Sequence, residues 1–240
     1  MNSFGFKFPV QERKTALYNL EEEWYLPLLL KLRNIPMQSI KRSNFGQYSM
    51  AVNYLTSVLE EASAINKVAV YNIDHMAQLL FSGADVVALL NRALTGNFTE
   101  MKVGQCKYTL LLNEQGGVQD DMILMRVTET SFILVINAGH DITDTIEVEG
   151  VKKEYIADID RIMACKKDGE EVWAKDISDT LLKIDVQGPL AFKLLKEVYG
   201  ENVLKNRYNP EKNMNFFTFN QFERNGQHYY LSRTGYTNRW

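Results

Sequence analysis

Two adjacent aspartates, Asp120 and Asp121, are the residues of this sequence best placed to do chemistry. They follow the Gly116-Gly117 turn and open an apolar segment. An unpaired buried carboxylate is costly, so such a residue either reaches solvent or faces a cavity where its charge is used. Strand alternation puts Asp121 and Ile123 on one face and Asp120 and Met122 on the other. One aspartate is therefore expected to face each way.

Spacing alone leaves two interpretations of this aspartate pair open. Both residues could flank the turn and accept backbone hydrogen bonds near Gly116-Gly117, which is the interpretation that spacing by itself favours. Alternatively, one carboxylate lies in a cleft and is used chemically. The elements around the pair decide between the two.

Three apolar segments are predicted to form antiparallel strands around the aspartates, at residues 105–113, 118–127 and 131–137. The glycines of the first turn adopt positive φ at little cost. Aromatic residues alternate on either side of Asn225-Gly226, which predicts a second hairpin near the C-terminus.

Two strand–glycine–helix units are predicted about a hundred positions apart. The first has a strand at 77–82, Gly83 and an amphipathic helix from residue 86; the second has a strand at 181–186, Gly188-Pro189 and a helix from residue 191. Tyr48 to Ala64 is predicted as a further helix, and 67–74 as a strand. Helices with antiparallel sheets predict an α+β fold.

Composition narrows the class of protein and of partner. The net charge of −3, without a Lys/Arg cluster, gives no electrostatic case for binding nucleic acid or an anionic membrane. Cys106 and Cys165 are the two cysteines, and no Cys/His spacing predicts a disulfide framework or a metal site. No signal peptide and no membrane-spanning run are recognisable, so a cytoplasmic setting is expected.

The three histidines predict no catalytic triad, because no nucleophile with a local signature accompanies them. They are His75, His140 and His228, the last beside the Asn-Gly turn, where a surface position is expected.

Four ordered segments together resemble one protein family. They are "VGQCKYTLLLNEQGGVQDDMILMRV…FILVINA", "YNIDHM" at 71–76, "DVQGPLA" at 185–191 and "SRTGYT" at 232–237. In this order they are similar to the glycine-cleavage T-protein (aminomethyltransferase) superfamily. The resemblance extends over residues 71 to 240 and is loose before that.

The resemblance implies a folate-binding fold and one-carbon transfer onto tetrahydrofolate. It places Asp121 beside the reacting nitrogens as the catalytic acid/base or electrostatic residue, with Asp120 as its structural neighbour. It also implies a pterin pocket lined by Tyr108, Asn137, Met76 and Tyr236, to which Ile123 is added as the neighbour of Asp121 on its strand face. Without the resemblance, Tyr108 and Met76 would be assigned to the core and Asn137 to a strand end.

Departures from the family pattern refine the expected branch. Thr95-Gly96-Asn97 replaces the usual Thr-Asn-Asp, and Met125 stands where a Tyr is frequent, which argues against glycine cleavage itself. "VGQCKY" is closer to the demethylase branch, which moves methyl groups from small sulfonium or methoxy compounds to tetrahydrofolate. The motif of the iron–sulfur-linked branch is not found.

The ending of the sequence leaves alternatives open. The family continues past Arg-Thr-Gly-Tyr-Thr into a C-terminal β-barrel, whereas this sequence stops at Trp240. We expect an N-terminal helical segment at 1–66 and a folate-binding region at 67–240 that lacks this barrel. The alternatives to an autonomous transferase are a half-enzyme that needs a partner chain and a non-catalytic folate-binding or structural protein.

Overall fold

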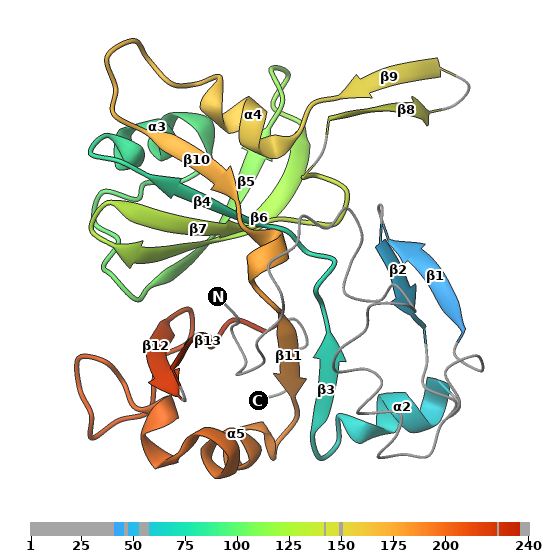
Figure 1. Cartoon of the computed structure of the whole chain (residues 1–240), viewed down its shortest axis with the longest axis vertical. Coiled ribbons are helices and arrows are strands. Elements are labelled where there is room, and N and C mark those ends of the chain that lie inside the picture. Colours follow the sequence, from blue (N-terminus) through green and yellow to red (C-terminus); the bar gives the residue numbers. More distant parts are fainter. Residues whose placement is uncertain are drawn as a thin grey trace. The chain divides into compact units, whose positions relative to one another are not determined.

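The structure is a computed structural model that describes residues 41–45, 48–52, 58–141, 143–148, 151–224 and 226–235 (Figure 1). The chain divides into two compact units. The second unit comprises Met76–Ser178 and Phe216–Phe219, and the first unit contains the other described residues. The domain boundary predicted between residues 66 and 67 stays a prediction.

An antiparallel five-stranded sheet forms the centre of the second unit, in the order β10-β4-β7-β6-β5. Its strands are β4 (Gln78–Ser82), β5 (Cys106–Leu112), β6 (Val118–Thr128), β7 (Ser131–Val135) and β10 (Trp173–Asp176). The predicted strands at 77–82, 105–113, 118–127 and 131–137 are thereby confirmed within one or two residues at most ends.

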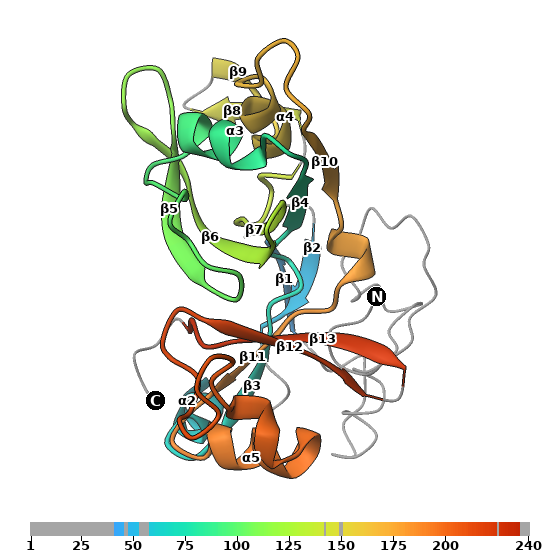
Figure 2. The same cartoon turned by 90° about the vertical axis from the view of Figure 1, so that its left-hand side faces the viewer.

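Two helices, α3 (Val86–Ala93) and α4 (Asp158–Met163), pack on the same side of this sheet (Figure 2). The apolar stripe of α3 is buried, and Ile162 of α4 joins the same core. Large strand side chains complete that core, including Leu79, Phe81, Met122, Leu124, Phe132 and Leu134. One face of the sheet is thus covered by helices, and the residues described below lie on both faces.

A β-hairpin, β8 (Asp144–Val148) and β9 (Val151–Tyr155), lies in the chain between β7 and α4. Its base is closed by two hydrogen bonds from backbone amides: the amide of Asp158 donates to the carbonyl of His140 (2.9 Å), and the amide of Ala157 donates to the side-chain Oγ1 of Thr143 (2.9 Å). These contacts hold the N-terminus of α4 against the loop that follows β7.

The first unit consists of short antiparallel pairs and helices. Its elements are β1 (Arg42–Phe45), β2 (Tyr48–Ala51), α2 (Val58–Ala64), β3 (Ala69–Asn72), β11 (Ile184–Gln187), α5 (Ala191–Tyr199), η3 (Glu201–Leu204), β12 (Phe219–Arg224) and β13 (Gln227–Ser232), with η2 (Ser178–Thr180) at the junction. The predicted hairpin around residue 226 is confirmed as β12–β13.

The helix predicted from Tyr48 to Ala64 is wrong over its first part. Tyr48–Ala51 is strand β2, paired with β1, and the helix α2 begins only at Val58. Leu59, which helical spacing would place on one apolar face with Tyr48 and Ala51, is exposed. Apolar spacings of three and four over so short a stretch also fit a strand, so periodicity misjudged this segment.

The two strand–glycine–helix units are confirmed. In each of them the glycine occupies a position that no other residue can adopt easily. Gly83 (φ +146°) lies between β4 and α3, where an added Cβ would come within 1.9 Å of the carbonyl oxygen of Glu171. Gly188 (φ +110°) precedes α5, where a Cβ would meet the Ile65 carbonyl at 2.6 Å. Both positions need positive φ and close backbone approach.

The α+β class with antiparallel sheets is therefore confirmed. Within the described ranges, no helix is long and apolar enough to cross a membrane.

Candidate functional site

Asp120 and Asp121 face opposite sides of β6, as strand alternation predicts. Asp120 lies on the helix-covered side and is only 3% exposed, whereas Asp121 is exposed on the other side. They pair with Leu111 and Leu110 of β5, respectively. The chain thus places one carboxylate at the edge of the core and one at an exposed position on the other face of the sheet.

The preceding turn does not depend on these aspartates. Oδ1 of Asn113 accepts hydrogen bonds from the amides of Gly117 (2.7 Å) and Gln115 (3.0 Å). The two aspartates instead bond to Asn137, at the end of β7. The interpretation that both residues merely cap the turn is therefore wrong.

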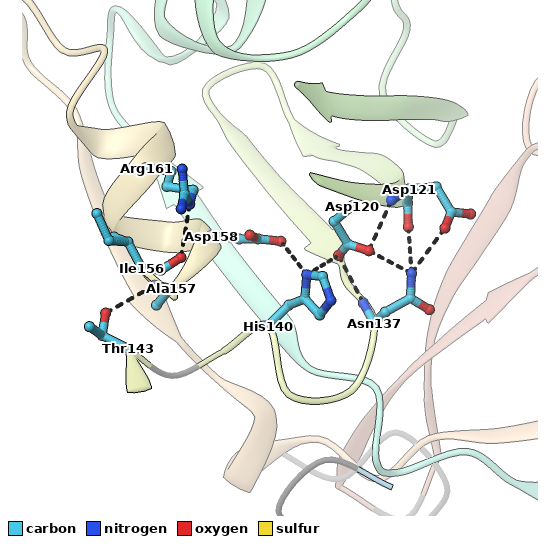
Figure 3. A network of polar contacts seen from close by, with 9 residues as sticks. All are labelled: Asp120, Asp121, Asn137, His140, Thr143, Ile156, Ala157, Asp158 and Arg161. Carbon is cyan, nitrogen blue, oxygen red and sulfur yellow. Dashed lines mark hydrogen bonds and ion pairs between the residues drawn. The ribbon is translucent and has the colours of Figure 1, made fainter. Parts of the chain in front are cut away.

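Asn137 joins the two aspartates (Figure 3). Its Nδ2 donates to Oδ1 of Asp120 (2.6 Å), to the carbonyl of Asp121 (3.1 Å) and to Oδ1 of Asp121 (3.1 Å). Its backbone amide donates to Oδ2 of Asp120 (3.1 Å), and the amide of Asp121 donates to Oδ1 of Asp120 (2.9 Å). One buried carboxylate therefore fixes the backbone of both other residues.

The face opposite the helices carries Tyr108 and Ile123 beside Asp121. Tyr108 pairs with Ile123 across β5 and β6, and its hydroxyl donates diagonally to Oδ2 of Asp121 (3.0 Å). The Tyr108 side chain is 55% exposed, so it is not a core residue. The hydrogen bond to Asp121 raises the pKa of the Tyr108 hydroxyl. An aromatic ring, a carboxylate and an amide are thus held together at an open surface.

His140 and Asp158 complete the cluster on the covered side, and sequence reasoning missed both. Nδ1 of His140 lies 3.6 Å from Oδ2 of Asp120 and 3.6 Å from Oδ2 of Asp158 (Figure 3). Hydrogen bonding to Asp158 raises the pKa of His140, and burial raises the pKa of Asp120. His140 lies three residues after Asn137, but its partner Asp158 comes from α4, beyond the β8–β9 hairpin. No local sequence pattern predicts that contact.

Three of these residues also satisfy the distances of a cation site. One donor atom each from Asp120, His140 and Asp158 lies within 4.8 Å of the others. However, both oxygens of Asp120 already accept hydrogen bonds from Asn137 and from the Asp121 amide. Asp120 is thus part of a hydrogen-bonded network whether or not a cation binds.

Two further predicted pocket residues differ in what the structure says of them. Met76 is 8% exposed, and continuing the β4–β7 register by two residues puts it opposite Asn137. The amide of Ile136 donates to the carbonyl of Ala77, in keeping with that register. Tyr236 lies outside the described residues. The pocket roles of Tyr108, Ile123, Asn137, Met76 and Tyr236 stay predictions.

Comparison with known proteins gives one family. Residues 38–239 match the family model described as the GCVT N-terminal domain. Aminomethyltransferase from Pseudothermotoga lettingae is 29% identical over 198 residues, which are 82% of this chain and 48% of that protein. Aminomethyltransferase from Thermus thermophilus is 29% identical over 167 residues, which are 69% of this chain and 43% of that protein.

A solved structure shares the fold. The crystal structure of glycine cleavage system aminomethyltransferase T from Bartonella henselae is similar with a TM-score of 0.66 and 24% identity, covering 89% of this chain and 50% of that one. The chain thus spans about half the length of the relatives it matches.

Proposed function

We propose, from the premise that this chain belongs to the family of the GCVT N-terminal domain, that it is the folate-binding part of a tetrahydrofolate-dependent one-carbon transferase. Asp121 is the catalytic carboxylate in this proposal. Tyr108, Ile123 and Asn137 contact the pterin, together with Met76 and Tyr236. The observation that carries the proposal is the exposed carboxylate of Asp121, held in place by both Tyr108 and Asn137.

The residues present suit a reduced pterin. Tyr108 offers an exposed ring on which a pterin can stack. The carboxylate oxygens of Asp121 and the side-chain carbonyl oxygen of Asn137 can accept hydrogen bonds from the N–H groups of the pterin. Asn137 donates all its described hydrogen bonds through nitrogen, so its side-chain oxygen is oriented away from the aspartates. Tetrahydrofolate, when bound, supplies the nucleophilic nitrogen that accepts the one-carbon group.

Asp121 is placed to act on a nitrogen whose charge rises during bond formation. A fixed anion near an amine that becomes positively charged stabilises that change and can accept its proton. Tyr108 and Asn137 restrict the Asp121 side chain to one orientation, which lowers the cost of reorganisation during the reaction. Asp120, held in the interior, contributes by fixing the backbone under Asp121.

The proposal also concerns the one-carbon donor, the cellular location and a partner chain. We favour a small methylated donor over the glycine-cleavage substrate, because of Thr95-Gly96-Asn97 and the "VGQCKY" segment. A cytoplasmic location and a partner chain belong to the same proposal.

Calorimetric titration with tetrahydrofolate tests the proposal. We expect saturable binding by the wild-type chain, weakened about tenfold by Tyr108→Ala through loss of the stacking surface. Tyr208→Ala, at another exposed tyrosine, is the matched control and should bind as the wild type does. A folded chain that shows no binding would overturn an autonomous folate site and leave the half-enzyme or the non-catalytic protein.

A donor screen then separates transfer from binding. Small sulfonium, methoxy and aminomethyl compounds are incubated with the chain and tetrahydrofolate, and the folate products are identified by mass. Asp121→Asn should slow transfer on the order of 10²- to 10⁴-fold, and Asp168→Asn, at an exposed aspartate elsewhere in the same unit, should not. Equal rates for both variants would exclude Asp121 as the catalytic residue.

A further inference from the structure

The inner carboxylate, Asp120, holds the site together. It accepts hydrogen bonds from the side chain and the backbone amide of Asn137 and from the backbone amide of Asp121. Asn137 in turn contacts the side chain of Asp121. The position of the exposed carboxylate therefore depends on whether Asp120 remains an acceptor on both of its oxygens.

Ionised Asp120 accepts on both oxygens, but its surroundings oppose its charge. The side chain is 2% exposed, and burial raises its pKa in spite of the hydrogen bonds from Asn137. Asp158, which is fully buried, adds a second negative charge nearby. Two buried carboxylates without a cation would repel each other and draw a proton.

His140 is the group that can supply the balancing charge. Its Nδ1 lies 3.6 Å from a carboxylate oxygen of each aspartate, and its side chain keeps 25% of its surface exposed, so it exchanges protons with water. The charged groups that face it are Asp120 on β6, Asp158 on α4 and Asp141 on its own loop, and all are acidic. The imidazolium is therefore favoured over the neutral ring.

We propose that His140 is a positioning residue for the folate site: its imidazolium balances Asp120 and Asp158 together and so keeps Asp120 in the form that orders Asn137 and Asp121. The functional consequence rests on the proposed function. The ordering itself does not, because it concerns only residues of this chain.

The proposal gives the site a pH dependence of definite sign. His140 has a pKa raised above its usual 6.5. Below that raised value the imidazolium is present and the cluster is ordered. As the pH rises through it, the positive charge is lost, and the ionised carboxylates of Asp120 and Asp158 repel each other without a balancing cation. This repulsion loosens the hydrogen bonds that hold Asn137. The folate site is therefore ordered below the raised pKa of His140 and loosens above it.

Histidine titration by NMR tests the ordering without any ligand. The chain has three histidines, so the His140 signal is assigned by its absence from His140→Asn. We expect a titration midpoint above 6.5 that falls in Asp158→Asn, and side-chain amide signals of Asn137 that move with the same midpoint. A midpoint at or below 6.5, or Asn137 signals indifferent to it, would overturn the proposal.

Tetrahydrofolate affinity across pH provides the second readout. Wild-type affinity should fall as the pH rises through the His140 midpoint. His140→Asn should bind about tenfold more weakly on the acidic side, equivalent to about 1.4 kcal/mol, and should show no change in that window. His228→Asn, at an exposed histidine of the first unit, is the control and should keep the wild-type profile. A wild-type pH profile in His140→Asn would overturn the proposal.

The two readouts distinguish the possible failures. If no variant binds tetrahydrofolate while Asn137 still titrates with His140, the proposed function fails and the positioning role stands. If tetrahydrofolate binding is normal but independent of His140, the proposed function stands and the positioning role of His140 fails. Titration with Zn²⁺ alone tests whether Asp120, His140 and Asp158 bind a metal ion instead. Saturable Zn²⁺ binding that removes the His140 titration would overturn the proposed charge-balancing role of His140.

Discussion

Two buried carboxylates, Asp120 in the second unit and Asp74 in the first, differ in the hydrogen-bond partners that the fold gives them. Asp120 receives three hydrogen bonds and faces His140. Oδ1 of Asp74 accepts only the amide of Lys183 among the described hydrogen bonds, and its buried Oδ2 has no partner among the described residues. Burial raises the pKa of Asp74 to about 8 and lowers that of Lys183 to about 8.

The difference teaches that burial alone does not decide what a carboxylate contributes. At Asp120 the fold provides donors that require an acceptor, so the charge is part of the structure. At Asp74 a single backbone donor is served by either a neutral or a charged oxygen, so the charge is mainly a cost. Neutral substitutions at the two positions should therefore act in opposite directions.

The largest expected effect is that of Asp120→Asn. Three donors converge on Asp120, and an amide offers one acceptor oxygen while pointing N–H groups at the remaining donor and at His140. We expect a loss of about 2–4 kcal/mol in the free energy of unfolding, measured by urea denaturation. Asp168→Asn is the control and should change it by less than about 0.5 kcal/mol. An Asp120→Asn variant as stable as the wild type would remove the distinction between the two carboxylates.

Asp74→Asn should stabilise the chain at alkaline pH. Its raised pKa means that the contribution of Asp74 to stability is present at low pH and is lost as the pH rises through about 8. Asn keeps the acceptor for the Lys183 amide and never ionises. At about pH 9, where Lys183 is also mostly neutral, we expect a gain of about 1–2 kcal/mol that shrinks as the pH falls.

The measurement is a set of urea denaturation curves for both proteins at several pH values. A variant that is less stable than the wild type at the alkaline end would show that ionised Asp74 is as well supported as Asp120.

His140→Asn should lower stability on the acidic side only. Since the folded-state pKa of His140 is raised, its stabilising contribution is fully present below 6.5 and is lost as the pH rises through the raised value. We expect a deficit of about 1 kcal/mol at about pH 5.5 that disappears as the pH rises through the raised pKa of His140. Thermal unfolding across this range, with His228→Asn alongside, gives the comparison. A deficit that is constant with pH would indicate lost packing instead of lost charge.

Much of the fold could be predicted because short-range patterns control it. Period-two alternation assigned Asp120 and Asp121 to opposite faces, and the structure agrees. The turns at Gly116-Gly117 and Gly226 were readable, because hairpin turns need residues that tolerate positive φ. The segment at Tyr48 failed because four residues are too few to separate a helical period from a strand period.

The candidate site was only half predictable for a related reason. Tyr108, Asp121 and Asn137 were named through the resemblance to the T-protein superfamily, because spacing alone assigned them to the core, to a turn and to a strand end. His140 and Asp158 are brought together by the closure of the β8–β9 hairpin base, a tertiary event with no signature in either residue's neighbours. The role of Asp120 was underestimated because its importance lies in the donors around it, which only the folded chain displays.

The smallest effect on stability is expected at Asp121, and that contrast with its neighbour is informative. Asp121→Asn removes a charge at an exposed position and keeps an oxygen that can accept from Tyr108 or Asn137, so the free energy of unfolding should change by less than about 0.5 kcal/mol. The same substitution should shift the Tyr108 hydroxyl. Its pKa is raised chiefly by the hydrogen bond to Asp121, so loss of the negative charge should move it down toward its ordinary value of 10. Tyrosine ring signals followed by NMR, with Tyr108→Phe to assign them, measure this directly. A stability loss comparable to that of Asp120→Asn would mean that the outer carboxylate is structural as well, and the division of this pair into one residue that builds the site and one that uses it would fail.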